Sequence, residues 1–382
     1  MGFLGGDKMI YKKIKICFVA PKAYPFFNPK NKLTKKIIMG GGEIQLGFIA
    51  KELAKDNSLD INFMVADYGQ RNIEEWSKVK VFKFLNFKNN PFKRLYHFIR
   101  IFNKINADLY VQRALDAGGG IIALYCNLKR KKFVYMVAHD KEVNGKFERN
   151  HSIFSNFLAN LTFKLADQII VQNILQREIL RERLNLGGIL IKSMYSIKLK
   201  SKNFRRDSIL WVGRCEEWKR PKIFLSLAKK FPNEKFVMIC PPALNQSEYF
   251  NKVKENASKI KNLKFIEYVP FNKIQKYFNE ARVFINTSDQ EGFPNTFIQA
   301  GIGKTPIISL NVDPNNFLEK YNCGFCCKDN FEIACQNLKK LLKNRSLYQK
   351  MSNNVFKYVK ENHDIKLNIK KFEELIKTNV DH

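Results

Sequence analysis

The sequence predicts an α/β protein with two doubly wound, Rossmann-like domains that face each other across an interdomain cleft. Three observations lead to this fold class. The chain has 382 residues, which is more than one hydrophobic core usually organises. In both halves continuous apolar runs alternate with amphipathic stretches, a pattern typical of strands buried on both faces of a parallel sheet. A polar, basic stretch at 198–207 separates the halves and predicts a linker.

The predicted elements follow one another in a regular order. In the first half we expect strands at 14–20, 61–66, 109–112, 133–138 and 168–172. In the second half we expect strands at 209–212, 236–239, 263–269, 283–286 and 306–310, and helices at 220–230, 248–260, 272–280 and 295–303. We therefore predict one domain at 9–197, a second at 208–362 and a final segment at 363–382. Ligands should bind at the carboxyl ends of the strands, in the cleft.

The charge of the chain indicates an anionic partner. The 67 Lys and Arg residues against 35 Asp and Glu residues give a net charge of +32. Phosphate ligands, nucleic acid and an acidic membrane surface all fit this charge. Residues 78–104 contain eight basic residues and no acidic one, interleaved with Phe and Tyr. Two interpretations stay open: a basic, aromatic face on anionic lipid, or a strand and a helix with a buried Phe side and a solvated Lys side.

Apolar stretches and cysteine usage indicate the cellular compartment of the protein. No apolar stretch reaches the about 18 to 20 residues that span a bilayer, and residues 1–11 lack a signal-peptide core. Most of the eight Cys residues lie in apolar runs, and the group at 323–335 has neither zinc-ligand spacing nor a nearby His. We expect a reduced cytoplasmic protein without a metal site, with peripheral attachment to the inner face of the plasma membrane as an extension.

A glycine-rich turn follows the first predicted strand. Gly41 and Gly42, at the head of a helix, permit close approach of the backbone to a ligand, and a helix start favours anionic groups. The turn is not a G-x-G-x-x-G motif. Glu43 also cannot replace the ribose-binding acid that such motifs carry about 20 residues on. A dehydrogenase is therefore disfavoured.

Two further strand ends carry polar residues. His139 ends one predicted strand and should face the cleft, although a structural histidine bonded to a loop carbonyl is equally compatible. Arg214 follows another strand, and Lys219 precedes the next helix. Two cations at this spacing could neutralise a leaving diphosphate without a metal. For Arg220 and Lys222 a solvated surface charge is a credible alternative.

The most specific segment is 286–301, where a strand, a turn and a helix start follow one another. Glu291 precedes the helix and can accept hydrogen bonds from ligand hydroxyls. The free N–H groups near Pro294, Asn295 and Thr296 face the place where a phosphate would lie. Gln299 follows Glu291 by eight residues, one turn into the helix.

Together these motifs resemble those of a family 4 glycosyltransferase (GT4) of the GT-B fold, within the glycosyl transferases group 1, over nearly the whole chain. The resemblance implies that His139 contacts the sugar and acts in catalysis with Glu291. It implies donor binding by Gly41, Gly42, Arg214, Lys219, Phe293, Pro294, Asn295, Thr296 and Gln299. The E-x7-E signature of the family has Gln299 in place of its second acid, which holds the ribose hydroxyls. An amide can still accept one hydrogen bond and donate another, without the strength that charge adds.

The resemblance also implies a reaction. It implies retaining, metal-independent transfer of a hexosyl group from a UDP- or GDP-linked sugar to a glycan or lipid-linked acceptor, in bacterial surface polysaccharide synthesis. The first domain would bind the acceptor and the second the nucleotide sugar, and a helix within 363–382 would cross back to the first. The chain has no D-x-D pair, and no separate cofactor is expected.

Two other classes of function are compatible with parts of the sequence. A nucleotide-sugar epimerase or a phosphorylase would use the same fold, but the segment around Glu291 fits an epimerase less well and no pyridoxal-binding lysine stands out. A non-catalytic, basic nucleic-acid-binding protein would explain the charge. The sequence has no helix-turn-helix, RRM or zinc-finger pattern, and this alternative leaves the strand-end motifs unexplained. Nucleic acid is therefore not expected as a partner.

Overall fold

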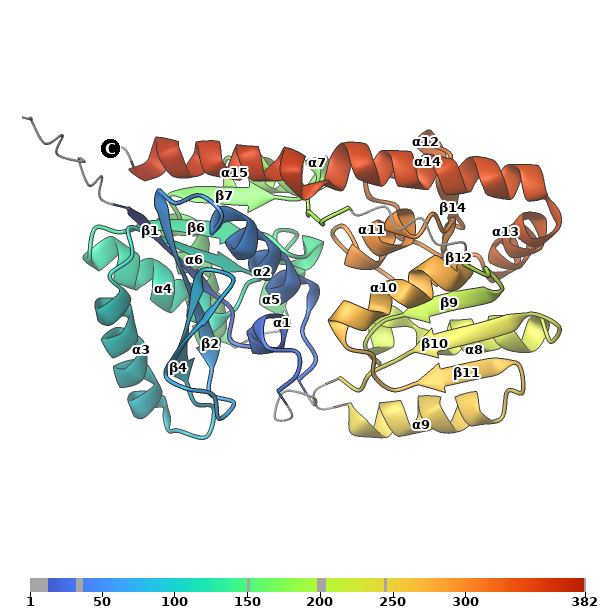
Figure 1. Cartoon of the computed structure of the whole chain (residues 1–382), viewed down its shortest axis with the longest axis horizontal. Helices are drawn as coiled ribbons and strands as arrows, with labels where there is room; N and C mark the ends of the chain where they lie inside the picture. Colours follow the sequence, from blue (N-terminus) through green and yellow to red (C-terminus); the bar gives the residue numbers. More distant parts are fainter. Residues whose placement is uncertain (1–12, 32–36, 150–151, 198–203, 244–245, 381–382) are drawn as a thin grey trace, which may run out of the picture.

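The computed structural model describes residues 13–31, 37–149, 152–197, 204–243 and 246–380. They form two β-sheets, each with hydrophobic cores against both of its faces (Figure 1). This arrangement confirms the predicted α/β fold with two Rossmann-like domains. Residues 9–12 of the predicted first domain and 198–203 of the predicted linker lie outside the described residues.

The N-terminal sheet has the strand order β3-β4-β2-β1-β5-β6-β7-β8. Its strands are β1 (Ile14–Val19), β2 (Leu59–Ala66), β3 (Ile73–Trp76), β4 (Val79–Leu85), β5 (Leu109–Arg113), β6 (Lys132–Met136), β7 (Gln168–Val171) and β8 (Ile189–Leu190). Neighbours pair in parallel apart from β3, which pairs antiparallel with β4. One face packs against α2 (Gly41–Leu53) and α15 (Ile365–Val380). The other packs against α3 (Pro91–Ile105), α4 (Ala117–Leu128), α6 (Ile153–Leu165) and α7 (Ile174–Leu184). Two short helices, α1 (Tyr24–Phe27) and α5 (Lys146–Arg149), lie in connecting loops.

The C-terminal sheet is parallel, with the order β11-β10-β9-β12-β13-β14. Its strands are β9 (Ser208–Val212), β10 (Lys235–Ile239), β11 (Leu263–Ile266), β12 (Ala281–Asn286), β13 (Ile307–Ser309) and β14 (Gly324–Cys326). One face packs against α8 (Pro221–Lys230), α9 (Ser247–Ser258) and α13 (Phe331–Lys343). The other packs against α10 (Phe271–Glu280), α11 (Asn295–Ile302), α12 (Phe317–Lys320) and α14 (Arg345–His363).

The predicted strands and helices are all present, with ends shifted by at most three residues. Strands β3, β8 and β14 were missed. They have four, two and three residues, which is too short for a periodic pattern to stand out. The run at 78–104 divides into β4 and α3.

The last two helices run nearly end to end across both domains (Figure 1). Helix α14 ends at His363, and α15 packs against α2 of the N-terminal domain. The junction is fixed by Tyr195, whose backbone N donates to the carbonyl of His363 at 2.8 Å and whose carbonyl accepts from the N of Ile365 at 3.0 Å. The segment that leaves the N-terminal domain near Tyr195 and the junction of α14 and α15 are therefore hydrogen-bonded to each other.

No helix in the described part of the chain is long and apolar enough to cross a membrane. No group of three or more His, Cys, Asp or Glu side chains in that part is arranged to hold a metal ion.

Candidate active site

Glu291 lies in the loop between β12 and α11, at the carboxyl edge of the C-terminal sheet. Its Oε1 accepts three hydrogen bonds, from Lys219 Nζ at 2.6 Å, Ser288 Oγ at 2.8 Å and Asn286 Nδ2 at 3.3 Å. Its Oε2 has no hydrogen-bond partner among the residues that the structure describes. Burial opposes ionisation of Glu291, but the Lys219 ammonium and the hydrogen bonds outweigh it and lower the pKa of the carboxyl. One oxygen of an ionised carboxylate is thus fixed, and the other is open to a ligand hydroxyl.

His139 meets this loop from the other domain. It follows β6 and precedes a 3-10 turn, η2 (Asp140–Glu142). Its Nδ1 accepts a hydrogen bond from the backbone N of Lys141 at 3.1 Å, and its Nε2 lies 3.1 Å from the carbonyl oxygen of Gln290. The proton therefore resides on Nε2, which donates to that carbonyl. Burial lowers the pKa of His139 to about 4, so the ring is neutral at physiological pH. A bond to a loop carbonyl was one of the two alternatives for this residue, and here that loop carries Glu291.

Trp218 joins the residues around this contact, although the sequence did not single it out. Its ring makes an edge contact with His139, with centroids 5.6 Å apart and planes at 84°. Lys219 Nζ lies 4.2 Å and Lys141 Nζ 5.0 Å from the Trp218 ring centroid. The Trp218 indole thus lies at the contact between the two domains, and one lysine ammonium from each domain lies over its ring.

The first turns of α2 and α11 meet across the cleft. Asn295 Nδ2 donates to the carbonyl of Gly41 at 3.1 Å, and Asn295 Oδ1 accepts from Gln45 Nε2 at 3.0 Å. Gln45 Oε1 in turn accepts from the backbone N of Met194 at 2.8 Å. A Cβ on Gly41 would lie 2.6 Å from Asn295 Nδ2, whereas a Cβ on Gly42 would have ordinary contacts at 3.7 Å or more. A Cβ at Gly41 would therefore displace the Asn295 amide from these hydrogen bonds, whereas a Cβ at Gly42 would not.

Gly292 is a second close contact between the domains. A Cβ there would lie 2.9 Å from Gln176 Nε2 and 3.1 Å from both Gln172 Nε2 and the carbonyl oxygen of Ala138. These partners follow β6 and β7 in the N-terminal domain, next to His139. The glycine directly after Glu291 therefore allows the loop to lie against the opposite domain.

The remaining residues of the 293–296 segment fall into two groups. Phe293 has a buried ring that packs on His363 and Phe317, with centroids 4.3 and 5.3 Å apart, so this side chain belongs to the core and not to the cleft. Pro294 occupies the N-cap position of α11, and Asn295 and Thr296 form its first turn. The first N–H groups of a helix lack intrahelical acceptors, and they provide a positive end at the cleft.

The basic residues after β9 have different environments. Arg214 is within 3.3 Å of Glu216 and is 39% exposed. Arg220, for which a solvated charge had been an alternative, is mostly buried. Its Nε lies 2.7 Å from Asp289 Oδ1, and its Nη1 pairs with Asp329. That alternative is wrong for Arg220, which fastens the loop before Glu291.

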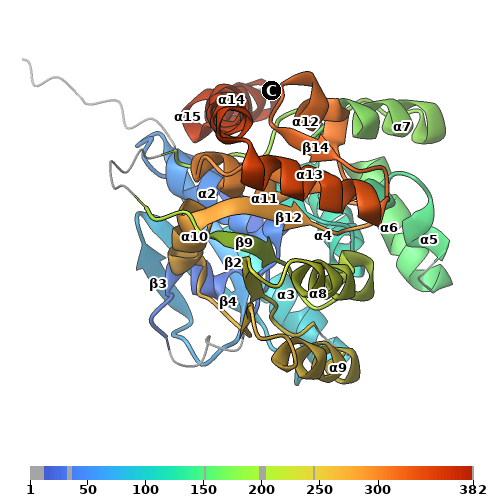
Figure 2. The same ribbon diagram turned by 90° about the vertical axis from the view of Figure 1, so that its right-hand side faces the viewer.

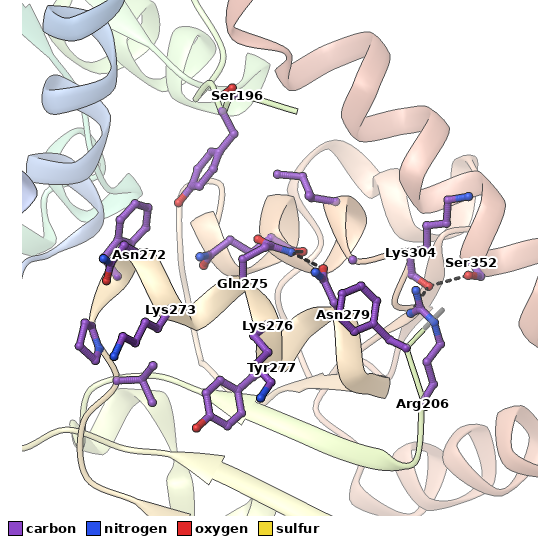
Figure 3. A pocket seen from close by; sticks show the side chains of 18 of the residues that line it. Ser196, Arg206, Asn272, Lys273, Gln275, Lys276, Tyr277, Asn279, Lys304 and Ser352 are labelled. Carbon is purple, nitrogen blue, oxygen red and sulfur yellow. Dashed lines mark hydrogen bonds between the residues drawn. The ribbon is translucent and has the colours of Figure 1, made fainter. Parts of the chain in front are cut away.

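Gln299 lines a cavity of about 1800 Å³. Figure 3 shows this cavity, with Gln275 and Asn279 of α10 among its lining residues. The lining of the cavity includes Val269 and Phe271, which follow β11 at the carboxyl edge of the sheet. Gln275 Nε2 donates both to the carbonyl of Gln299 at 3.0 Å and to Asn279 Oδ1 at 3.1 Å. The described lining is mainly aromatic, aliphatic and amide; its charged members are all Lys or Arg, and it contains no Asp or Glu.

Comparisons with known proteins agree with this geometry. Residues 197–358 match the family model of glycosyl transferases group 1. The chain is 24% identical to the uncharacterized glycosyltransferase MJ1069 of Methanocaldococcus jannaschii, over 88% of this chain and 94% of that one. The chain is a glycosyltransferase. This result excludes the non-catalytic alternative.

Solved structures show the same fold as this glycosyltransferase. Sucrose-phosphate synthase from Thermosynechococcus elongatus superposes with a TM-score of 0.78 at 14% identity, over 96% of this chain and 99% of that one. HepE of Anabaena, in complex with UDP and glucose, superposes with a TM-score of 0.72 at 14% identity, over 96% and 100%. Both cover the two domains together.

The glycosyltransferase has one more unusual residue in its N-terminal domain. Arg113 is the last residue of β5 and lies next to the start of α2. Its side-chain Cγ lies 3.7 Å from a Cβ built on Gly42. Its Nη2 donates to Ser193 Oγ at 3.1 Å, and its buried Nε has no partner within the described residues. Burial lowers the pKa of Arg113 to about 10. Position alone could have drawn attention to it, because it ends a central strand.

Proposed function

We propose that the protein is a retaining, metal-independent glycosyltransferase that moves a hexosyl group from a UDP-linked donor to a glycan or lipid-linked acceptor. The observation that carries the proposal is the ionised Glu291, with one oxygen held by its own domain and the other available to sugar hydroxyls. HepE, which has the same fold, is described in complex with UDP and glucose and with UDP-glucose. This supports a UDP-sugar as the donor here.

The leaving diphosphate would lie between α11 and the basic loop after β9. The first turn of α11 offers the N–H groups of Asn295 and Thr296, and Arg214 and Lys219 add positive charge. One N–H of the Lys219 ammonium binds Glu291, which leaves two for phosphate oxygens. Such preorganised groups stabilise charge as it develops on a leaving group. They make a metal unnecessary in this proposal.

In the proposed reaction the acceptor oxygen bonds to the anomeric carbon as the bond from that carbon to the phosphate oxygen breaks on the same face. The acceptor proton passes to the leaving phosphate oxygen. His139 does not serve as the base, because its Nδ1 lone pair is occupied by Lys141 and its pKa is about 4. We assign His139 to holding the Glu291 loop against the N-terminal domain, beside the sugar.

The nucleoside would occupy the cavity that Gln299 lines. Its amide can accept from one ribose hydroxyl and donate to the other. Guanine presents two adjacent N–H donors, and a carboxylate is their best-matched acceptor. The described lining of this cavity contains no carboxylate. Uracil presents two carbonyl acceptors, which suit the lysines and amides that are there. UDP is therefore favoured over GDP.

The acceptor would bind to the N-terminal domain, where Arg113 and the start of α2 form the opposite wall. A cytoplasmic enzyme that extends a surface glycan or its lipid-linked precursor fits this arrangement.

Nucleotide preference and stereochemistry test the proposal together. We expect calorimetric titration in the presence of a chelator to give tighter binding of UDP than of GDP. Proton NMR of the first product formed should show the anomeric configuration of the donor. Tighter GDP binding would overturn the nucleoside assignment, and an inverted product would overturn the retaining mechanism.

A further inference from the structure

Three neighbouring helices cover one face of the N-terminal sheet. Tyr125 of α4 contacts the rings of Phe98 and Phe102 of α3, with centroids 6.3 and 5.0 Å apart. Helices α4 and α6 approach so closely that a Cβ on Gly120 would collide with the carbonyl oxygen of Leu158. The three helices therefore lie next to one another, on the side away from α2 and α15 (Figure 2).

The outer side of this surface is strongly apolar. Phe92 is 83% exposed, and it starts a stripe on α3 with the spacing of one helical face. Ile153 and Phe154, at the start of α6, are 90% and 70% exposed. We call the whole set the α3–α6 face: Phe92, Leu95, Tyr96, Ile99, Leu124, Leu128, Ile153, Phe154 and Phe157. Exposed apolar side chains gathered on neighbouring helices in this number mark an interaction site.

Apart from Phe87, which is exposed in the loop before α3, the aromatic residues of 78–104 are divided between the core and this face. Phe82, Phe84, Phe98 and Phe102 are buried, so the interpretation with a buried Phe side holds for them. Phe92 and Tyr96 point outward and belong to the α3–α6 face. The exposed apolar surface also reaches α6, well outside the basic run of the sequence.

The charge on the α3–α6 face has one sign. Helices α3, α4 and α6 and the turn at 129–132 contain no Asp or Glu. Their exposed cations form no ion pair with any residue that the structure describes; these are Lys93, Arg100, Lys104, Lys129, Arg130 and Lys164. A second copy of this chain would bring like charge to like charge. A nucleic acid would leave Ile153, Phe154 and Leu128 without apolar partners.

We propose that the α3–α6 face docks on an anionic lipid bilayer. Phe92, Tyr96, Ile153, Phe154 and Phe157 would enter the boundary between headgroups and acyl chains, and the surrounding cations would contact lipid phosphates. Because a helix that follows a parallel strand begins at the carboxyl edge of the sheet, the first turns of α3 and α6 lie toward the edge that forms the cleft. Docking here brings the acceptor side of the cleft toward the bilayer. The inference does not depend on which donor the enzyme uses.

Vesicle binding tests the proposal with matched variants. Sedimentation with phosphatidylcholine vesicles, with or without phosphatidylglycerol, would be measured at low and high salt. The triple variant K93Q/R100Q/K104Q should bind anionic vesicles about a hundredfold more weakly, at about fivefold for each cation lost. The control K339Q/K343Q/K350Q removes the same charge from the C-terminal domain and should bind like the unmodified protein. The variant F154S/F157S, at exposed positions, should also lose binding.

The outcomes separate this proposal from the proposed function. Donor turnover with water or a soluble acceptor should be unchanged in all variants, so a lost transferase activity does not bear on docking. Equal loss in the two triple variants would show a general charge effect and would overturn the proposal. Unchanged binding of F154S/F157S would overturn the apolar contact. Binding to duplex DNA that needs the same cations, with no vesicle binding, would assign the face to nucleic acid instead.

Discussion

Replacing Glu291 by Gln should separate nucleotide binding from sugar transfer. Glu291 and Lys219 form an ion pair at 2.6 Å, with side chains only 13% and 16% exposed. The substitution keeps the acceptor oxygen for Ser288 and Asn286, but it leaves the Lys219 ammonium without its counter-charge. Breaking a fully buried pair costs about 3 to 5 kcal/mol. Because this pair retains some solvent contact, we expect about 2 kcal/mol lower stability of the C-terminal domain.

The same change has opposite effects on two ligands. A hydrogen bond from a sugar hydroxyl to a charged group contributes about 1.5 to 3 kcal/mol, so kcat/KM should fall roughly tenfold to a hundredfold. UDP lacks the sugar, and the unpaired Lys219 gains a partner in its diphosphate. UDP should therefore bind to Glu291→Gln at least as tightly as to the unmodified protein.

Denaturant unfolding, calorimetry with UDP and a coupled assay of UDP release measure the three quantities. Glu291→Asp, which keeps the charge but shortens the reach, serves as the control and should retain UDP affinity close to normal. The reasoning is refuted if Glu291→Gln turns over at the normal rate. It is also refuted if UDP affinity falls together with turnover.

Three other changes test separate contacts. Gly41→Ala places a Cβ 2.6 Å from Asn295 Nδ2 and should weaken donor binding by calorimetry, whereas Gly42→Ala should be tolerated; equal effects would contradict the interdomain contact. Gln299→Glu should tighten UDP binding about fivefold and Gln299→Ala should weaken it, as expected for a charge-assisted bond to ribose; no change in either variant would place the ribose elsewhere. The folded pKa values of His139, about 4, and His363, about 3, lie below the ordinary value of 6.5. The unfolded chain therefore binds more protons than the folded chain below pH 6.5. The free energy of unfolding should fall as pH drops from 6.5 toward 4, by up to about 1.4 kcal/mol per pH unit for each His. His363→Gln should reduce that slope, and an unchanged slope would contradict the buried neutral state.

Much of the fold could be predicted because local patterns determine it. Continuous apolar strands, helix starts such as Pro221 after Arg220, and the rhythm of the second half all appear in the sequence. The strand ends then pointed to Glu291, His139 and Lys219, because parallel strands present their carboxyl ends at one edge. The structure brings these three residues to the same part of the cleft.

Contacts between the domains could not be predicted in this way. The His139–Gln290 contact joins residues 151 positions apart, and the Gln45–Asn295 contact joins residues 250 apart. Nothing local distinguishes Gln45 from any other helical glutamine. The ring of Phe293 shows the reverse case, since its place in a signature segment suggested a ligand contact and its packing on His363 makes it part of the core.

The central claim is that Glu291 binds the sugar of a UDP-linked donor and that transfer needs no metal. The most direct measurement is UDP release from a panel of UDP-sugars in the presence of a chelator, with Glu291→Ala run in parallel. The account predicts release with one donor class, unaffected by the chelator and lost in the variant, while UDP still binds the variant. Release that requires added metal, or that persists in Glu291→Ala, would contradict it.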